Sequence, residues 1–331
     1  MLLQRVDRHI ATILSDFQQA RELSDHWRNE RLAEVLLWAA LDERLAALRE
    51  DNLIEEFPRQ IGTRLWNAAG EEFMAKGWLC RRAYEKPRGY PGDYALLGAI
   101  VEQTVTDDPC GQHFDRYFLH QAAPLAVVAR TRLATQVIVA EAMTRFAASG
   151  RPEPLHVMSV GSGPALECVA AIEALPPENR DKLQFTLVDF DPEALDVASA
   201  NLTSLLPAER VQTVQCAATK IAARPKLAEK FPTGDLIICT GLFDYLDDAA
   251  AAAMLALFWK RLNPRGRMLV GQFAPHNSTK IFMEFVTAWY LTYRTTEELS
   301  LLVQGAGIPR NACRITSEAT GVDLFIDARK P

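Results

Sequence analysis

Two glycines in the run VGSGPA, Gly161 and Gly163, stand between a short apolar stretch and residues that favour a helix. The apolar stretch, residues 155–160, predicts a buried strand, so the glycines predict a tight strand-to-helix turn. Such a turn lets the backbone pass close to a bound molecule, and the new helix offers unpaired N–H groups to an anionic group. On these residues alone, a tight turn that binds nothing is an equally good interpretation.

A carboxylate follows at a position that suits a nucleotide. Residues 185–189 predict a second strand that ends in Asp189, 28 residues after Gly161 (189 minus 161), and Asp191 then opens another helix. In nucleotide-binding α/β proteins an acidic side chain near this place bonds the ribose hydroxyls. The two features together favour a nucleotide-type crevice.

The segment KPRGYPGDY, residues 86–94, carries a second polar set. Two prolines and two glycines exclude a helix or an inner strand, so the segment is irregular and lies between helices. Arg88 could clamp a carboxylate through its two-pronged donor face, and Asp93 could accept a hydrogen bond from an ammonium or hydroxyl group. With Tyr90 these residues predict a lid over the crevice; a solvated turn with surface tyrosines is the alternative.

Residues 273–294 supply a third group of candidates. Helical spacing places three aromatic residues, Phe282, Phe285 and Trp289, on one side. Aromatic faces can hold a cation with about 1 to 2 kcal/mol when desolvated, although a stripe at this spacing is more often helix core. His276 and Tyr293 are candidates for catalytic residues, with a capping role as the alternative for His276.

The elements that must position these residues alternate along the second half of the chain. The expected strands are 155–160, 185–189, 211–216, 235–240 and 267–273, with an alanine-rich helix from 248 to about 262 and a turn at 263–266. This alternation predicts an α/β fold with a doubly wound, mostly parallel sheet, whose ligands bind outside the carboxyl ends of the strands. Further candidates at such ends are Ala217, Gly241, Asp244 and Tyr245.

The first part of the chain has a different pattern. Apolar residues recur at helical spacing from 1 to about 85 and from about 112 to 150, and loop-forming residues follow at 148–154. We therefore expect a helical N-terminal lid domain at 1–150 and an α/β domain at 151–331.

The composition limits the possible partners. A net charge of −6 gives no general attraction to nucleic acid or to an anionic membrane. No apolar stretch reaches the roughly 18 residues of a membrane span, and the N-terminus is amphipathic, so we expect a cytoplasmic protein that acts on a small molecule. The six cysteines contain no CxxC pair. Neither a disulfide framework nor a metal site is therefore expected, and the oligomeric state is left open.

The motifs VGSGPA, LVDFDPEAL, DLIICTGLFDYL and LNPRGRMLVGQF together resemble the successive motifs of class I S-adenosylmethionine-dependent methyltransferases, over residues 155–275. The resemblance implies S-adenosylmethionine as the cofactor and a Rossmann-like catalytic domain. It also assigns roles along the crevice: Gly161 and Gly163 pass under the methionine part, Asp189 bonds the ribose, Phe190 and Ala217 flank adenine, and Thr240, Gly241 and Leu242 line the reacting end.

The sequence departs from this pattern at two positions. Ser159 stands where many members carry an acidic residue, and Ala165 stands where a third glycine is common. The first departure leaves the cofactor's ammonium group to another carboxylate, for which Glu167, Asp244 and Asp93 are the candidates.

RGYPGDY and HNSTKIFMEFVTAWYLTYRT resemble a narrower bacterial subgroup. It comprises 3-hydroxypalmitic acid methyl ester biosynthesis proteins, which are carboxyl O-methyltransferases, and azetidine-2-carboxylate synthases. The resemblance implies methyl transfer to a small-molecule or fatty-acyl carboxylate, or cyclisation of S-adenosylmethionine alone with release of methylthioadenosine. An NAD-dependent oxidoreductase is disfavoured because the turn lacks a third glycine and no Tyr-x-x-x-Lys pair follows. A non-catalytic cofactor-sensing module is a further alternative.

Overall fold

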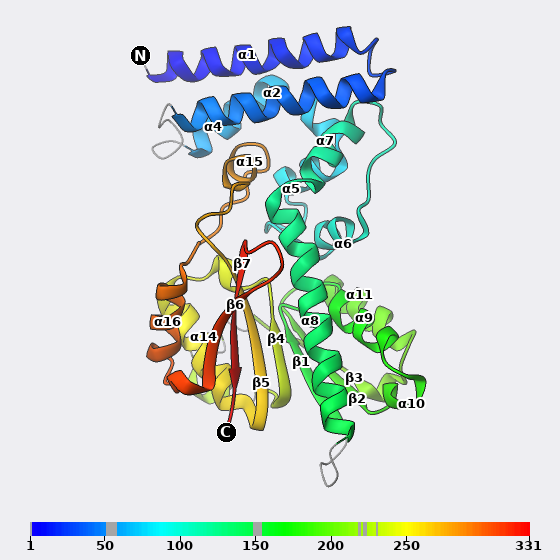
Figure 1. Cartoon of the computed structure of the whole chain (residues 1–331), viewed down its shortest axis with the longest axis vertical. Helices are drawn as coiled ribbons and strands as arrows, with labels where there is room; N and C mark the ends of the chain where they lie inside the picture. The colour runs from blue at the N-terminus through cyan, green and yellow to red at the C-terminus, as the bar shows by residue number, and fades with distance from the viewer. Residues whose placement is uncertain (1, 51–57, 148–153, 218–219, 221–223, 230) are drawn as a thin grey trace. The chain divides into compact units, whose positions relative to one another are not determined.

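The computed structural model describes residues 2–50, 58–147, 154–217, 220, 224–229 and 231–331 (Figure 1). The chain forms two compact units, one of residues 1–125 with 277–290 and one of residues 126–276 with 291–331. The sequence pattern instead predicts a single division at 150. The difference arises because the long helix before the first strand packs its apolar side into the core of the sheet unit.

The first unit is helical, as predicted from its apolar spacing. Its helices are α1 (Leu2–Leu23), α2 (Glu30–Glu50), α4 (Pro58–Leu65), α5 (Trp78–Glu85), α6 (Tyr94–Glu102), α7 (Gly111–Leu119) and α15 (Lys280–Phe285), with a π-helical turn at Trp66–Gly70 and a 3-10 turn at Met74–Lys76. Phe17 of α1 lies in the centre, with its ring 5.4 Å from those of both Phe73 and Phe114. The irregular segment predicted at 86–94 separates α5 from α6.

Residues 277–290 return to this helical unit from the sheet unit. The ring of Phe282 packs against Tyr117 at 5.2 Å and Phe118 at 5.8 Å, and the indole of Trp66 donates a hydrogen bond to the carbonyl of Val286. Helix α15 ends at Phe285. The predicted single stripe that also includes Trp289 is therefore wrong, and the aromatic residues of α15 are core residues.

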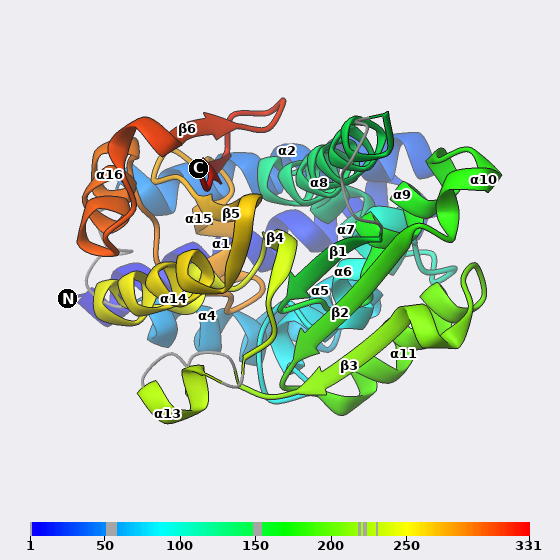
Figure 2. The ribbon, with the colours of Figure 1, turned by 90° about the horizontal axis from the view of Figure 1, so that it is seen from below.

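The second unit contains a seven-stranded sheet in the order β3-β2-β1-β4-β5-β7-β6 (Figure 2). Its strands are β1 (Leu155–Val160), β2 (Leu183–Asp189), β3 (Val211–Gln215), β4 (Gly234–Cys239), β5 (Leu262–Phe273), β6 (Cys313–Ser317) and β7 (Asp323–Arg329). The first five in chain order are parallel, whereas β7 runs antiparallel to both β5 and β6. The predicted doubly wound, mostly parallel sheet is confirmed.

Helices cover both faces of this sheet. They are α8 (Ala122–Ala147), α9 (Leu166–Ala174), α10 (Pro177–Arg180), α11 (Pro192–Thr203), α13 (Pro225–Ala228), α14 (Asp248–Arg261) and α16 (Thr296–Gly305), with 3-10 turns at Ala208–Arg210, η4 (Phe243–Tyr245) and Arg310–Ala312. Successive strand residues point to opposite faces. Val157 accordingly joins the core under α8, α9 and α11, and Met158 joins the core under α14 and α16.

Helix α8 is long and apolar enough to span a membrane by length and composition, contrary to the expectation that no such stretch exists. Its buried residues Ala134, Val137 and Ile138 pack on the sheet, however, which explains its apolar character as that of a core helix.

The turn predicted at 263–266 is part of β5 in the structure. The strand begins irregularly, with a register shift opposite residues 234–236 and a left-handed backbone at Arg265 (φ +62°). Proline and glycine here mark a bulged strand start and not a separate turn.

Candidate active site

The glycine turn predicted after the first strand is present. Gly161 (φ +64°) and Gly163 (φ +48°) adopt the left-handed backbone that strains most other residues. The N–H groups of Gly161 and Ser162 both donate to the carbonyl of Val188, at 2.8 and 3.2 Å, so β2 holds the turn in place. The hydroxyl of Ser162 is buried and has no hydrogen-bond partner among the described residues.

Asp189 connects the end of β2 to this turn. Its Oδ2 accepts a hydrogen bond from the Gly163 N–H and its Oδ1 accepts one from the Asp191 N–H, both at 3.0 Å. Burial raises the pKa of Asp189, while these backbone donors oppose the rise. Each oxygen retains acceptor capacity for a ligand hydroxyl. The next residue, Phe190, leaves 51% of its surface exposed, which is unusual for so large an apolar side chain beside a strand end.

Glu167 lies beside Ser159 at the start of α9. The Ser159 hydroxyl donates to Oε1 of Glu167 at 3.0 Å. The Glu167 carboxylate, carried by α9, therefore lies next to the β1 position at which Ser159 replaces the acidic residue of the family pattern. Burial raises the pKa of Glu167, while Ser159 and the charge of Arg130 oppose the rise. Of the three candidate carboxylates, Glu167 is therefore the one that lies against Ser159.

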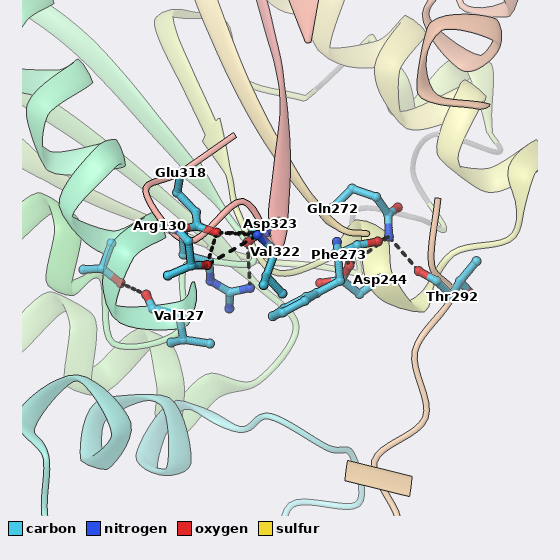
Figure 3. Close-up of polar contacts among 11 residues, drawn as sticks. Val127, Arg130, Asp244, Gln272, Phe273, Thr292, Glu318, Val322 and Asp323 are labelled. Atoms are coloured by element: carbon cyan, nitrogen blue, oxygen red, sulfur yellow. Dashed lines mark hydrogen bonds and ion pairs between the residues drawn. The ribbon is translucent and has the colours of Figure 1, made fainter. Parts of the chain in front are cut away.

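Arg130 of α8 is a further candidate that was not predicted from the sequence. Its side chain is 6% exposed, and its Nη1 lies 3.4 Å from Oδ2 of Asp323 at the start of β7 (Figure 3). A Cβ atom added to Gly241 would stand 3.2 Å from Nη2. The guanidinium therefore lies at the carboxyl end of β4, which Gly241 follows.

Asp244 is 2% exposed and accepts hydrogen bonds from the backbone N–H of Phe273 at 2.7 Å and from Nε2 of Gln272 at 2.9 Å (Figure 3). Burial raises the pKa of Asp244 to about 6, and the charges of Arg130 and Arg294 oppose the rise. These partners are groups of the protein itself, so the Asp244 carboxylate links the segment after β4 to the end of β5.

The remaining strand-end candidates lie in the second unit. Ala217, Thr240 and Leu242 are partly exposed, as is Tyr293, and Tyr245 is 40% exposed in η4. A Cβ atom added to Gly161 would stand 3.6 Å from Cβ of Leu242, so the turn and the end of β4 are in contact. His276 is exposed, and its Nε2 lies 2.8 Å from the carbonyl oxygen of Gly321.

The predicted lid residues lie in the first unit. Asp93 is 2% exposed and caps α6, accepting hydrogen bonds from the N–H groups of Ala95 and Leu96 at 3.0 and 2.9 Å. It also accepts one from Nε of Arg82 at 2.9 Å. Arg88 and Tyr90 are half-buried in the same segment. The structure thus gives Asp93 a capping function, and the lid stays a prediction.

Replacing Asp93 with alanine is expected to lower the free energy of unfolding by about 2 kcal/mol, because α6 loses its cap and the neighbouring guanidinium loses its carboxylate. Urea denaturation measures the change. Asp93→Ser is the control, since a serine oxygen still caps the helix and should recover part of the loss. An Asp93→Ala variant as stable as the parent would show that the cap contributes nothing.

Comparisons with known proteins support the fold. No family model and no curated protein match the sequence. A solved structure described as a possible exported protein from Bordetella parapertussis is 20% identical, with a TM-score of 0.55 over 72% of this chain and 79% of that one. The apo structure of the S-adenosylmethionine-dependent methyltransferase SibL is 17% identical, with a TM-score of 0.47 over 100% of this chain and 96% of that one. Magnesium protoporphyrin IX methyltransferase (ChlM) from Synechocystis PCC 6803, with bound SAH, is 12% identical over 62% and 85% of the two chains, with a TM-score of 0.45.

The class of fold follows from the order and direction of the strands. The chain has a doubly wound, mostly parallel sheet and a helical N-terminal region, as predicted. At identities of 20% and below, the likeness concerns the fold alone. Among the described residues, no group of three or more His, Cys, Asp or Glu side chains could hold a metal ion.

Proposed function

We propose that this protein is an S-adenosylmethionine-dependent transferase. The observation that carries the proposal is the hydrogen bond between Asp189 and the Gly163 N–H, which joins a left-handed glycine turn to a strand-end carboxylate. The exposed ring of Phe190 suits an adenine face, and the buried Ser162 hydroxyl has no hydrogen-bond partner among the described residues. Solved structures of ChlM hold SAM or SAH, which agrees with this choice of cofactor.

Each candidate residue of the second unit would bind a different part of this cofactor. Asp189 would bond the ribose, Phe190 and Ala217 would flank adenine, and the glycine turn would lie under the amino-acid arm. Glu167 would accept hydrogen bonds from the ammonium group. When bound, S-adenosylmethionine supplies a sulfonium whose neighbouring carbons are electrophilic and whose leaving group is a neutral sulfide. The protein therefore needs no acid for the leaving group, and its contribution is to orient the reactants and exclude water.

The default reaction is methyl transfer to a small-molecule or fatty-acyl carboxylate. A carboxylate is ionised at pH 7, so it requires positioning and no base. In the second unit, Tyr245, His276 and Tyr293 are the candidates for contact with the acceptor. Arg88, whose two-pronged donor face suits a carboxylate, and Tyr90 stay predictions from the sequence. We further propose a cytoplasmic location without nucleic-acid or membrane partners, in keeping with the net charge of −6.

Cyclisation of S-adenosylmethionine to azetidine-2-carboxylate is the second candidate, and Glu167 favours it. Ring closure requires the cofactor's amine in its neutral form, so a nearby group must take its proton. Burial raises the pKa of Glu167, which makes this carboxylate a better proton acceptor than an exposed glutamate. Its contact with Ser159 places it at the glycine turn, where the amino-acid arm would lie.

Incubation with S-adenosylmethionine alone, followed by mass spectrometry, separates the two reactions. Methyl transfer predicts an unchanged mixture that yields S-adenosylhomocysteine when a carboxylate acceptor is added. Cyclisation predicts methylthioadenosine and azetidine-2-carboxylate without any acceptor. If neither S-adenosylmethionine nor S-adenosylhomocysteine binds in a calorimetric titration while NAD does, the proposed function is wrong.

The affinity of the parent protein for S-adenosylhomocysteine should fall as the pH decreases through the raised pKa of Glu167. Below that pKa the side chain is protonated and no longer attracts the ligand's ammonium group. Glu167→Gln should bind more weakly at pH 7 and should lose this part of the pH dependence. Calorimetric titrations of both proteins between pH 5 and 8 provide the measurement. Protonation of Asp189 and Asp244 affects both proteins alike, so the difference between the two pH profiles reports on Glu167. Identical pH profiles would exclude Glu167 as the ammonium partner.

A further inference from the structure

We infer that Arg130 binds the carboxylate of the cofactor's amino-acid arm and that Asp323 positions it for this contact. The inference rests on the proposed function, and it assigns to one buried pair the recognition of an amino-acid head group. Three features of the second unit support it: unused donors on a buried cation, a glycine at one edge of that cation, and a carboxylate of opposite charge nearby.

The guanidinium of Arg130 is buried and only partly compensated. The side chain is 6% exposed, and its one hydrogen bond to a described residue is the long 3.4 Å contact from Nη1 to Oδ2 of Asp323. A guanidinium carries five N–H donors, and a buried charge is costly unless it is paired and hydrogen-bonded. Oδ1 of Asp323 is also buried without a partner among the described residues. The pair therefore leaves donor capacity for a further anion.

The space beside Nη2 is kept free by a glycine. A Cβ atom on Gly241 would stand 3.2 Å from Nη2 and 3.8 Å from Cζ of Arg130. The next residue, Leu242, lies against Gly161 of the glycine turn. Nη2 thus lies at the carboxyl end of β4, beside the residue that precedes Leu242, and Leu242 contacts the glycine turn that is proposed to lie under the amino-acid arm. In Figure 3 the guanidinium extends from Asp323 toward the part of the site that holds Phe273.

The charges around Arg130 match an α-amino acid. Its positive charge acts on Glu167, whose carboxylate lies against Ser159 near the end of β1. The carboxylate of an amino-acid head group would pair with the Arg130 guanidinium, and its ammonium group would pair with the Glu167 carboxylate. A guanidinium binds a carboxylate through two parallel N–H···O bonds, which fixes orientation as well as charge. The backbone N–H of Asp323, at the start of β7, donates to the Glu318 carboxylate at 3.0 Å. Asp323 is thereby held in place and orients the guanidinium of Arg130.

Calorimetric titration with two ligands tests the assignment. One is S-adenosylhomocysteine, and the other is its analogue that keeps the amine of the arm and lacks the carboxylate. Arg130→Gln should bind S-adenosylhomocysteine about 30-fold more weakly than the parent and should bind the analogue with unchanged affinity, as expected for loss of a charge-assisted hydrogen bond. Arg132→Gln, exposed on the same helix, is the matched control and should bind both ligands like the parent.

Gly241→Ala provides a second variant in case Arg130→Gln unfolds. It leaves the pair with Asp323 in place and obstructs Nη2, so it should weaken S-adenosylhomocysteine alone by a smaller factor. Equal weakening of both ligands by these variants, or no weakening of either, would overturn the inference. A parent protein that binds the analogue and fails to bind S-adenosylhomocysteine would overturn it as well. A parent that binds neither ligand would overturn the proposed function.

Discussion

Asp189→Ala should bind S-adenosylhomocysteine about 100-fold more weakly than the parent protein, because a ribose loses two hydrogen bonds to an ionised, largely buried carboxylate. The side chain is 8% exposed, so water replaces these bonds poorly. Part of the loss comes from the turn, since the Gly163 N–H also donates to this carboxylate. Calorimetric titration gives the affinity, and circular dichroism and thermal unfolding show whether the variant is folded.

A ligand without the 2′-hydroxyl separates the two causes. The parent should bind the 2′-deoxy form of S-adenosylhomocysteine more weakly than the ribose form, whereas Asp189→Ala should bind the two alike. Asp191→Ser is the control: Asp191 caps α11 through the Glu193 N–H at 3.0 Å, and serine preserves a capping oxygen. If Asp189→Ala still discriminates between the two ligands, the carboxylate does not bind the ribose.

The sequence predicts the strands and the turn around Asp189 well because their pattern is local. β1 has the predicted bounds, and Asp189 ends β2 as expected, since apolar runs bounded by glycine and an acidic residue leave little choice of register. The contact between Gly163 and Asp189 then follows from parallel neighbours whose carboxyl ends share one edge.

The other half of the site depends on contacts that sequence spacing does not encode. Arg130 lies on a helix before the first strand, and Asp323 begins an antiparallel strand near the end of the chain, 193 residues away. The alternation of strands and helices predicts that neighbouring strands are parallel. It does not predict that β7 pairs with β5 in the antiparallel direction. Similarly, residues 277–290 have helical spacing, yet their return to the helical unit depends on long-range packing of Phe282 against Tyr117 and Phe118.

Asp93 shows how a residue type can be identified correctly and its function remain open. An acidic residue after proline and glycine suits a ligand contact and equally suits a helix N-cap. Its hydrogen bonds to the first N–H groups of α6 are those of a cap. Only the three-dimensional structure distinguishes the two, because both require an exposed turn before a helix in the sequence.

Arg294→Met should lower the free energy of unfolding by about 3 to 5 kcal/mol at pH 7, the cost of removing one member of a buried charged network. Arg294 is 2% exposed, and it donates to the carbonyl oxygens of Phe243 and Leu246 at 3.2 and 2.6 Å and to Oε1 of Gln272 at 2.6 Å. The substitution leaves these three buried acceptors without this donor. Guanidinium chloride denaturation measures the loss. Asp248→Ala is the control: Asp248 also bonds Arg294, but its side chain is 82% exposed, so its removal should cost less than about 1 kcal/mol.

The loss in Arg294→Met should also depend on pH, through Asp244. Burial raises the pKa of Asp244 to about 6, above the usual range of an aspartate, because it disfavours the ionised form. The charge of Arg294 opposes that rise. A carboxyl whose folded-state pKa is raised costs no stability at a pH below its unfolded pKa, and its cost grows as the pH rises toward the folded pKa. Without the guanidinium the folded pKa of Asp244 rises further, so the variant bears a larger cost at pH 7 than at pH 5. The deficit relative to the parent should therefore be smaller at pH 5, and equal deficits at the two pH values would show that Arg294 stabilises the site through its hydrogen bonds alone.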